Sequence, residues 1–163
     1  MKNVLLVGGG KIGAMITELL VGCGDYRVTV ADRSAAALAE VAAHACVATL
    51  ELDVTDAAAL ADALTGKFAL LSAVPFSLTR HVADGAAAAG VHYFDLTEDV
   101  ETTRHVAELA KTAGSVMMPQ CGLAPGFISI AAYDLARRFE ELDMSACGSA
   151  RSPSIRPTAS NMN

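Results

Sequence analysis

The sequence predicts an α/β fold with a doubly wound parallel sheet of six strands in the order 3-2-1-4-5-6. Short apolar runs alternate with longer, alanine-rich segments of helical period along most of the chain. Such alternation is typical of right-handed βαβ crossovers in a parallel sheet. With 53% hydrophobic and 18% charged residues, the chain can fill a buried core. A glycine-rich turn follows the first apolar run directly, which is typical of a tight connection from a strand to a helix.

The first half of the chain predicts three strands. Residues 4–7 are apolar throughout, as a strand buried on both faces should be. A helix over 11–21 follows, because its apolar residues recur on one face and glycines close it. The second strand is expected over 27–31, and Ser34 is a good N-cap for a helix to about residue 44. The third strand is expected over 46–52.

The second half continues the same alternation. Asp56 is a good N-cap for a helix to about residue 64, and Gly90 and Gly114 are placed to close two later helices. The remaining expected elements are strand 68–73, helix 79–89, strand 92–96, a helix from residue 98 or 99 to about 113, strand 115–118 and helix 127–139.

Charge and composition exclude several classes of protein. Lys and Arg number 12 against 18 Asp and Glu, a net charge of −6, and without a basic run we expect no nucleic-acid partner. No uncharged apolar stretch reaches the roughly 18 residues of a membrane span, so we expect a cytoplasmic protein without a membrane partner. The 4 cysteines lack metal-ligand spacing, so we expect no metal site and reduced, mostly buried thiols.

The strongest motif is a G-x-G-x-x-G formed by Gly8, Gly10 and Gly13, with Lys11 and Ile12 inside it. It follows an expected strand and opens an expected helix, which is the context of the Rossmann dinucleotide fingerprint. Gly8 would allow the tight turn, Gly10 the approach of a pyrophosphate, and Gly13 the close packing of helix on strand. The helix N-terminus would then face the phosphates with free N–H groups. A glycine-rich turn without a ligand is the alternative.

An acidic residue stands where this fingerprint requires one. Asp32 lies at the end of the second expected strand, where a carboxylate accepts both ribose hydroxyls of NAD and repels the 2′-phosphate of NADP. The neighbouring Arg33 could instead pair with that phosphate, so NAD is favoured and NADP stays open. Asp53 and Val54, after the third strand, could flank the adenine, although Asp at a strand end is also common in turns.

The loops after the fourth and fifth strands supply the remaining candidates. Ala73, Val74 and Pro75 follow the fourth strand beside the topological switch point, where we expect backbone against the nicotinamide ribose. Asp95 ends the fifth strand and should point toward the substrate crevice, which makes it a candidate catalytic residue. His81, near the start of the helix after the fourth strand, is the second catalytic candidate.

The fingerprint occurs together with the turn Gly122-Leu123-Ala124-Pro125-Gly126, and the pair resembles the saccharopine dehydrogenase-like family, within it the lysine 6-dehydrogenase type. In that family a G-x-A-P-G turn follows the sixth strand and leads a helix toward the substrate domain. The segment His92-Tyr93-Phe94-Asp95-Leu96 resembles the family's fifth strand, which also ends in an aspartate. The resemblance covers residues 1–143, the expected dinucleotide-binding domain with its first connecting helix.

The resemblance implies NAD(P)-dependent oxidation or reduction at a carbon–nitrogen bond of an amino acid, which would be the small-molecule partner. It also implies a second α/β domain and a homodimer. Residues 144–163 differ in kind, with 5 serines and no acidic residue, so we expect an irregular or disordered tail and no substrate domain. Two interpretations of the tail stay open, a shift of reading frame near Asp143 and a genuine end of the chain.

If that end is genuine, this chain could bind its cofactor and be inactive as a catalyst. A stand-alone NAD-binding regulatory module is the alternative function.

Overall fold

The computed structural model describes residues 1–44 and 47–139. The chain divides into two compact units, one over Met1–Cys121 and one that begins at Gly122. The expected start of the third strand at residue 46 and the expected tail over 144–163 lie outside the described residues.

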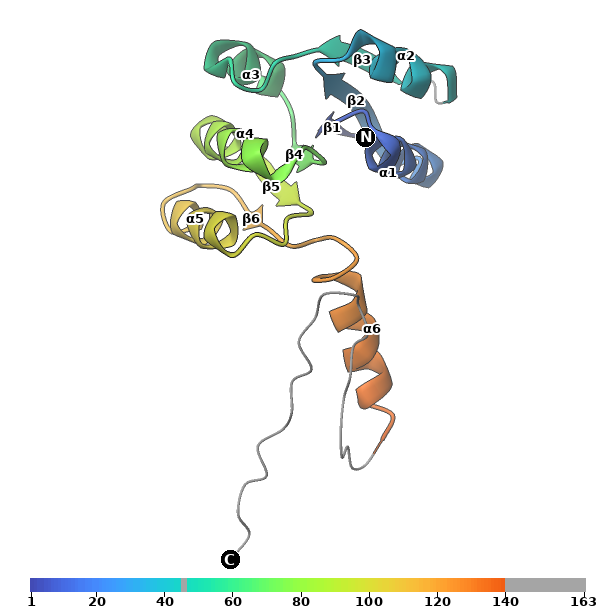
Figure 1. The fold of residues 1–163 in the computed structure, drawn as a ribbon, viewed down its shortest axis with the longest axis vertical. Helices are drawn as coiled ribbons and strands as arrows, with labels where there is room; N and C mark the ends of the chain where they lie inside the picture. Colours follow the sequence, from blue (N-terminus) through green and yellow to red (C-terminus); the bar gives the residue numbers. More distant parts are fainter. Residues whose placement is uncertain (45–46, 140–163) are drawn as a thin grey trace, which may run out of the picture. The chain divides into compact units, whose positions relative to one another are not determined.

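The first unit contains a six-stranded parallel sheet in the order β3-β2-β1-β4-β5-β6, which confirms the predicted fold (Figure 1). In the sheet register, Val7 lies opposite both Ala31 and Ser72, and Ser72 lies opposite Asp95. The carboxyl ends of four strands therefore meet at one edge. The strands are β1 (Lys2–Val7), β2 (Tyr26–Asp32), β3 (Ala48–Glu51), β4 (Ala69–Ser72), β5 (His92–Asp95) and β6 (Met117–Met118).

Helices cover the two faces of this sheet. The helices of the first unit are α1 (Lys11–Cys23), α2 (Ala35–His44), α3 (Ala57–Leu64), α4 (Phe76–Ala89) and α5 (Val100–Ala110). In Figure 1, α1 and α2 lie on one side of the strands, and α3, α4 and α5 lie on the other. This is the doubly wound arrangement, in which each crossover is right-handed.

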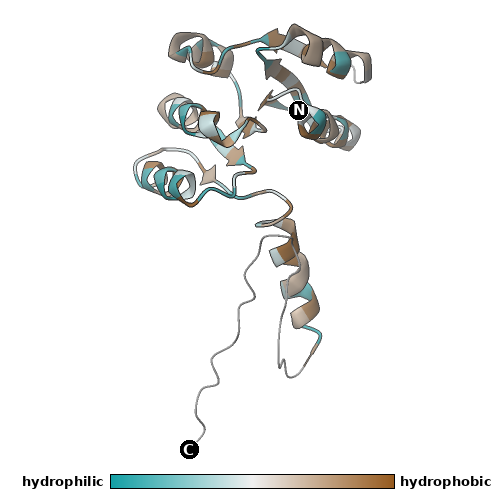
Figure 2. Ribbon diagram, in the orientation of Figure 1, coloured by the Kyte–Doolittle hydropathy of each residue, from teal (hydrophilic) through white to brown (hydrophobic). Residues whose placement is uncertain are grey.

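Each face has its own hydrophobic core. Leu5 packs with Leu60 of α3 and Val82 of α4, whereas the next residue, Leu6, packs with Leu38 and Val41 of α2. Leu5 and Leu6 are both fully buried, because successive side chains of a strand point to opposite faces. The buried run of β1 is accordingly apolar, from Val4 to Val7, while the helices carry both hydrophilic and hydrophobic residues (Figure 2).

Several predicted bounds were wrong by a few residues. Helix α4 begins at Phe76, three residues before the expected start, because Pro75 at its N-cap holds φ at −56° and leads straight into the helix. Strand β1 begins at Lys2 rather than residue 4, since Lys2 still pairs with Tyr26. Strand β6 has two residues, because the N–H of Val116 donates to His92 Nδ1 at 3.0 Å rather than to a strand.

The second unit begins with the predicted glycine-rich turn. Gly122 and Gly126 form a β-bridge, and Gly126 has a φ of 130°. The N–H of Phe127 donates to the Gly122 carbonyl at 2.9 Å, and α6 (Phe127–Ala136) follows. The predicted turn into a further helix is therefore confirmed, although the helix ends three residues earlier than expected.

Candidate functional site

The turn between β1 and α1 needs glycine at Gly8 and Gly13. Gly8 has a φ of 106°, and a Cβ there would lie 2.6 Å from the carbonyl oxygen of Ala73, in the loop after β4. A Cβ on Gly13 would overlap the carbonyl oxygen of Gly8, so the first turn of α1 packs directly on the end of β1. These glycines bring three backbone segments together at the carboxyl edge of the sheet.

Gly10 differs, because a Cβ there would meet no atom within 4 Å. Gly10 is the N-cap residue of α1, and no side chain accepts a hydrogen bond from the first N–H groups of the helix. These N–H groups are therefore free to bind a ligand. An anion at this point would accept hydrogen bonds from those groups and gain from the helix dipole. The space above Gly10 therefore fits a phosphate group, and a side chain at this position would fill it.

Asp32 ties the end of β2 to the glycine turn. Its Oδ2 accepts a hydrogen bond from the Gly9 N–H at 2.7 Å, and its Oδ1 accepts one from the Ser34 N–H at 2.8 Å. Each carboxylate oxygen has a second lone pair, so both can still accept a hydroxyl. The side chain is half-buried and lies above the cavity described next.

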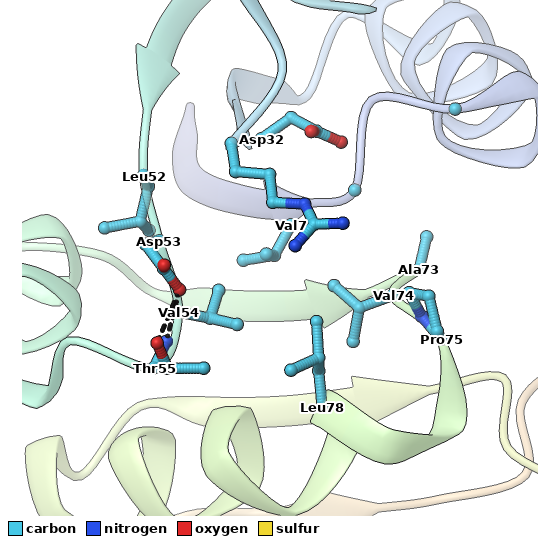
Figure 3. A pocket seen from close by; sticks show the side chains of 13 residues that line it. Val7, Asp32, Leu52, Asp53, Val54, Thr55, Ala73, Val74, Pro75 and Leu78 are labelled. Carbon is cyan, nitrogen blue, oxygen red and sulfur yellow. Dashed lines mark hydrogen bonds between the residues drawn. The ribbon is translucent and has the colours of Figure 1, made fainter.

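One cavity of about 680 Å³ brings most of the predicted cofactor residues together. Figure 3 shows Asp32 on one side, Asp53 and Val54 on another, and Ala73, Val74 and Pro75 at the far end. Its lining includes nine predicted residues, Gly8, Gly10, Asp32, Arg33, Asp53, Val54, Ala73, Val74 and Pro75. Lys11, Ile12 and Gly13 do not line it, since Gly13 is buried under the turn while Lys11 and Ile12 are exposed on α1.

The same cavity contains residues that the sequence analysis missed. Val7, Leu52, Thr55 and Leu78 also line it. Val7 and Leu52 adjoin predicted residues, so the ends of the first and third expected strands could have indicated them. Leu78 had no such signal, because the predicted helix began after it.

Asp53 makes turn contacts and also lines the cavity. Its Oδ1 accepts hydrogen bonds from the Thr55 N–H at 2.9 Å and the Thr55 hydroxyl at 2.7 Å, which is turn chemistry. These bonds, the backbone one first, hold the pKa of the Asp53 carboxyl below its usual value. The residue also lines the cavity, and so presents a carboxylate beside Arg33.

A second cavity of about 260 Å³ adjoins the first, and Ala73 and Val74 line both. It lies at the ends of β4 and β5, and Ile12 of the fingerprint forms part of its wall. Its remaining lining residues are Ser72, Phe76, Thr79, Leu96, Thr97 and Glu98. None of these six was a predicted site residue.

Asp95 is buried and outside both cavities, with 2% of its surface exposed. Its Oδ2 accepts the Tyr93 hydroxyl at 2.8 Å, and its Oδ1 accepts the N–H groups of Thr97 at 2.9 Å and Gln120 at 3.0 Å. Gln120 has a φ of 63°, which this hydrogen bond helps to hold. The carboxylate thus joins the end of β5 to the segment after β6.

His81 lies apart from the predicted cofactor residues. It is exposed on α4 and lines a different cavity, between α3 and α4, that also includes Ala57, Leu60 and Asp84. The two predicted catalytic residues are therefore not brought together with each other or with the glycine turn.

Two kinds of feature are absent from residues 1–44 and 47–139. Within these ranges, no group of three or more His, Cys, Asp or Glu side chains is arranged to hold a metal ion. No helix in the same ranges has the length and apolar character needed to cross a membrane. Two cysteines in these ranges are free thiols, and Cys23 is exposed at the end of α1, so the expectation of a buried thiol was wrong there.

Comparison with known proteins agrees with the fold and the glycine turn. Residues 4–118 match the family model of the saccharopine dehydrogenase NADP binding domain. The chain is 30% identical over 133 residues to the saccharopine dehydrogenase [NADP(+), L-glutamate-forming] of Saccharomyces cerevisiae, covering 77% of this chain and 28% of that enzyme. The chain thus spans less than a third of this relative's length.

Solved structures give the same result. Apo saccharopine dehydrogenase (L-Glu forming) from Saccharomyces cerevisiae superposes with a TM-score of 0.75 at 27% identity, over 84% of this chain and 31% of that one. GenD2 from gentamicin A biosynthesis, solved with NAD, gives a TM-score of 0.60 at 25% identity over 83% of this chain and 38% of that one. Biliverdin reductase from Synechocystis, solved with NADP+, shares the fold at a TM-score of 0.60 and 21% identity, over 72% of this chain and 37% of that one.

The fold, the strand order, the glycine turn and the match over residues 4–118 agree with one another. The chain therefore belongs to the saccharopine dehydrogenase family, and what it contains is that family's NAD(P)-binding domain.

Proposed function

We propose that this chain is the cofactor-binding part of an oxidoreductase that acts on a carbon–nitrogen bond of an amino acid, and that it prefers NAD to NADP. The observation that carries the cofactor preference is Asp32, whose carboxylate lines the larger cavity beside Gly8 and Gly10. Membership of the saccharopine dehydrogenase family supports the reaction class.

The two adjoining cavities suit the two halves of a dinucleotide. The pyrophosphate would lie over Gly10 at the N-terminus of α1, the adenosine ribose at Asp32, and the adenine beside Asp53 and Val54. The dinucleotide would then extend past Ala73 and Val74, which line both cavities, and its nicotinamide would lie in the smaller cavity. When bound, such a cofactor supplies hydride exchange with a substrate carbon.

The electrostatics around Asp32 favour NAD. A 2′-phosphate at the ribose would lie against the carboxylate, and two negative groups at close range repel each other. Arg33 is exposed at the cavity edge and could partly offset this repulsion. Asp53 lines the same cavity as Arg33, and its negative charge would also disfavour a second phosphate there.

Titration of the purified chain with NADH and NADPH, by calorimetry, tests this assignment. We expect NADH to bind more tightly than NADPH, and Asp32→Asn to weaken NADH binding by about tenfold, the loss of one charged hydrogen bond. The Asn side-chain oxygen can still accept the Gly9 N–H, while its amide nitrogen cannot accept the Ser34 N–H, so urea unfolding must show that the variant is folded. Asp62→Asn, on the exposed surface of α3, makes the same change of charge and should leave both affinities unchanged.

Two results would contradict the proposal at different levels. Tighter binding of NADPH than of NADH would overturn the preference while leaving the dinucleotide site in place. A folded chain that bound neither cofactor would overturn the dinucleotide site itself.

A further inference from the structure

The ionisable side chain in the lining of the smaller cavity is negatively charged. Among its lining residues, which all fall in the described part of the chain, Glu98 is the one with an ionisable side chain. The others are apolar or hydroxyl-bearing. Any electrostatic preference of this cavity for a ligand therefore depends mainly on one carboxylate.

Hydrogen bonds on both sides of Glu98 fix the loop that carries it. The Thr97 N–H donates to Asp95 Oδ1 at 2.9 Å, and the Asp99 N–H donates to the Thr97 hydroxyl at 3.2 Å. Asp99 in turn caps α5, accepting the Thr102 N–H at 2.7 Å. The side chains of Asp95, Thr97 and Asp99 thus form hydrogen bonds within the loop and to α5. Glu98 makes none of these bonds and is exposed.

Arg80, a basic side chain of α4, is already paired. Arg80 of α4 lies 3.1 Å from Glu101 of α5, which is one turn beyond Glu98. Within residues 1–44 and 47–139, Glu98 itself has no ion pair and no side-chain hydrogen bond. These residues therefore supply no counter-charge to Glu98, which lines the cavity.

We infer that Glu98 is the counter-charge at the reacting end of the site, and that the site takes a substrate whose nitrogen is cationic, a protonated amine or an imine. This rests on the proposed function, which places the nicotinamide in the smaller cavity. A carboxylate there attracts a cationic nitrogen and repels an anionic group. Glu98 thus connects an observed charge to the amine class of substrate.

The oxidised and reduced cofactors provide a direct test on the chain itself, because the oxidised nicotinamide ring is cationic and the reduced ring is neutral. Calorimetric affinities for NAD+, NADH and ADP-ribose are measured for the unmodified chain and for Glu98→Gln. We expect the variant to weaken NAD+ relative to NADH on the order of threefold to tenfold, for one charge partly screened by water. ADP-ribose lacks the ring and should bind both proteins equally.

Glu18→Gln is the matched control, since it removes the same charge from the exposed surface of α1 outside the cavity and leaves the pair of Arg80 and Glu101 intact. It should leave the ratio of NAD+ to NADH affinity unchanged. Raising the salt concentration should shrink the effect of Glu98→Gln, because screening weakens interactions between exposed charges.

A second arm tests the class of substrate with simple ions. Propylammonium added to the NADH-saturated chain should change the nicotinamide fluorescence, while propionate should not, and Glu98→Gln should remove the response to propylammonium. An equal response to both ions, or none to propylammonium, would overturn the amine assignment.

The cofactor measurements separate the two levels of inference. If ADP-ribose binds but Glu98→Gln leaves the ratio of NAD+ to NADH affinity unchanged, the role of Glu98 is wrong and the proposed function stands. If the unmodified chain binds none of the three nucleotides, the proposed function fails and the inference about Glu98 fails with it.

Discussion

At the scale of single residues, the three fingerprint glycines have different physical reasons to be glycine. Gly8 and Gly13 are required by the protein's own backbone, because a Cβ at either position would meet a carbonyl oxygen. Gly10 has open space around it, so the fold places no such demand there. The motif therefore combines two folding requirements with one position that is free for a ligand.

Two single substitutions should separate these roles. Gly13→Ala should lower the free energy of unfolding by about 3 kcal/mol, because the backbone of the β1–α1 turn must move to admit a methyl group. Gly10→Ala should cost less than about 1 kcal/mol, the difference between the two residues at an N-cap. It should nevertheless weaken NADH binding at least tenfold, since the methyl group would occupy the expected place of the pyrophosphate.

Urea unfolding and calorimetric titration of both variants check this pair. A Gly10→Ala chain that bound NADH as well as the unmodified chain would show that no ligand approaches this position. A Gly13→Ala chain of unchanged stability would contradict the packing of α1 on β1.

At the scale of elements, one close contact sets how α3 and α4 pack. A Cβ on Gly85 of α4 would lie 2.5 Å from Leu60 Cδ2 and 3.1 Å from its Cγ. Leu60 is 1% exposed, so its side chain has little room to move away. Glycine is tolerated inside this helix because it lets the two helices approach closely.

Gly85→Ala should therefore destabilise the protein by about 1 kcal/mol, the balance of an overpacking cost of about 2 and a gain in helix propensity of about 1. Gly22→Ala is the matched control, because Gly22 also lies in a helix but has no atom near its Cβ position. That variant should be unchanged or more stable by up to about 1 kcal/mol. Equal effects of the two substitutions on the urea midpoint would contradict the proposed contact.

At the scale of the whole molecule, the Tyr93 and Asp95 pair connects parts of the chain that are distant in sequence. Tyr93 is fully buried, and its hydroxyl donates to Asp95, which holds Gln120 after β6. Burial raises the pKa of Tyr93 well above its usual value, and the Asp95 carboxylate raises it further. The folded protein thus keeps this phenol protonated where the unfolded chain would lose its proton.

The sign of the pH dependence follows from this raised pKa. Its contribution to stability is fully present below the ordinary tyrosine value of 10.0 and is lost as the pH rises above it. We expect the free energy of unfolding to fall above that value with a Tyr93 contribution of up to about 1.4 kcal/mol per pH unit. Tyr93→Phe should remove this part of the slope.

The same variant should be less stable at neutral pH by about 1–3 kcal/mol, because a buried carboxylate oxygen loses its hydrogen bond. Urea unfolding at a series of alkaline pH values measures both effects. Tyr26→Phe, on β2, serves as the control and should keep the alkaline slope. An unchanged slope in Tyr93→Phe would contradict the assignment.

The sequence by itself determined the fold of the first unit and most of the residues that line the larger cavity. Hydrophobic period, capping residues and glycine turns act locally, so they specify each strand and helix, and the βαβ rule then orders the strands. Because the carboxyl ends of parallel strands meet at one edge, nine predicted cofactor residues lie around one cavity. Asp32 and Asp53 come together there from the ends of two strands.

Only the tertiary structure decided which polar residues line the larger and the smaller cavity. Asp95 ends a strand just as Asp32 does, yet the Tyr93 hydroxyl and two N–H groups enclose its carboxylate, and it lines neither of these two cavities. Glu98, three residues later, carries no motif in the sequence and nevertheless lines the smaller cavity. One of the groups that enclose Asp95, the Gln120 N–H, comes from a distant part of the chain, and a local sequence pattern contains no information about such a partner.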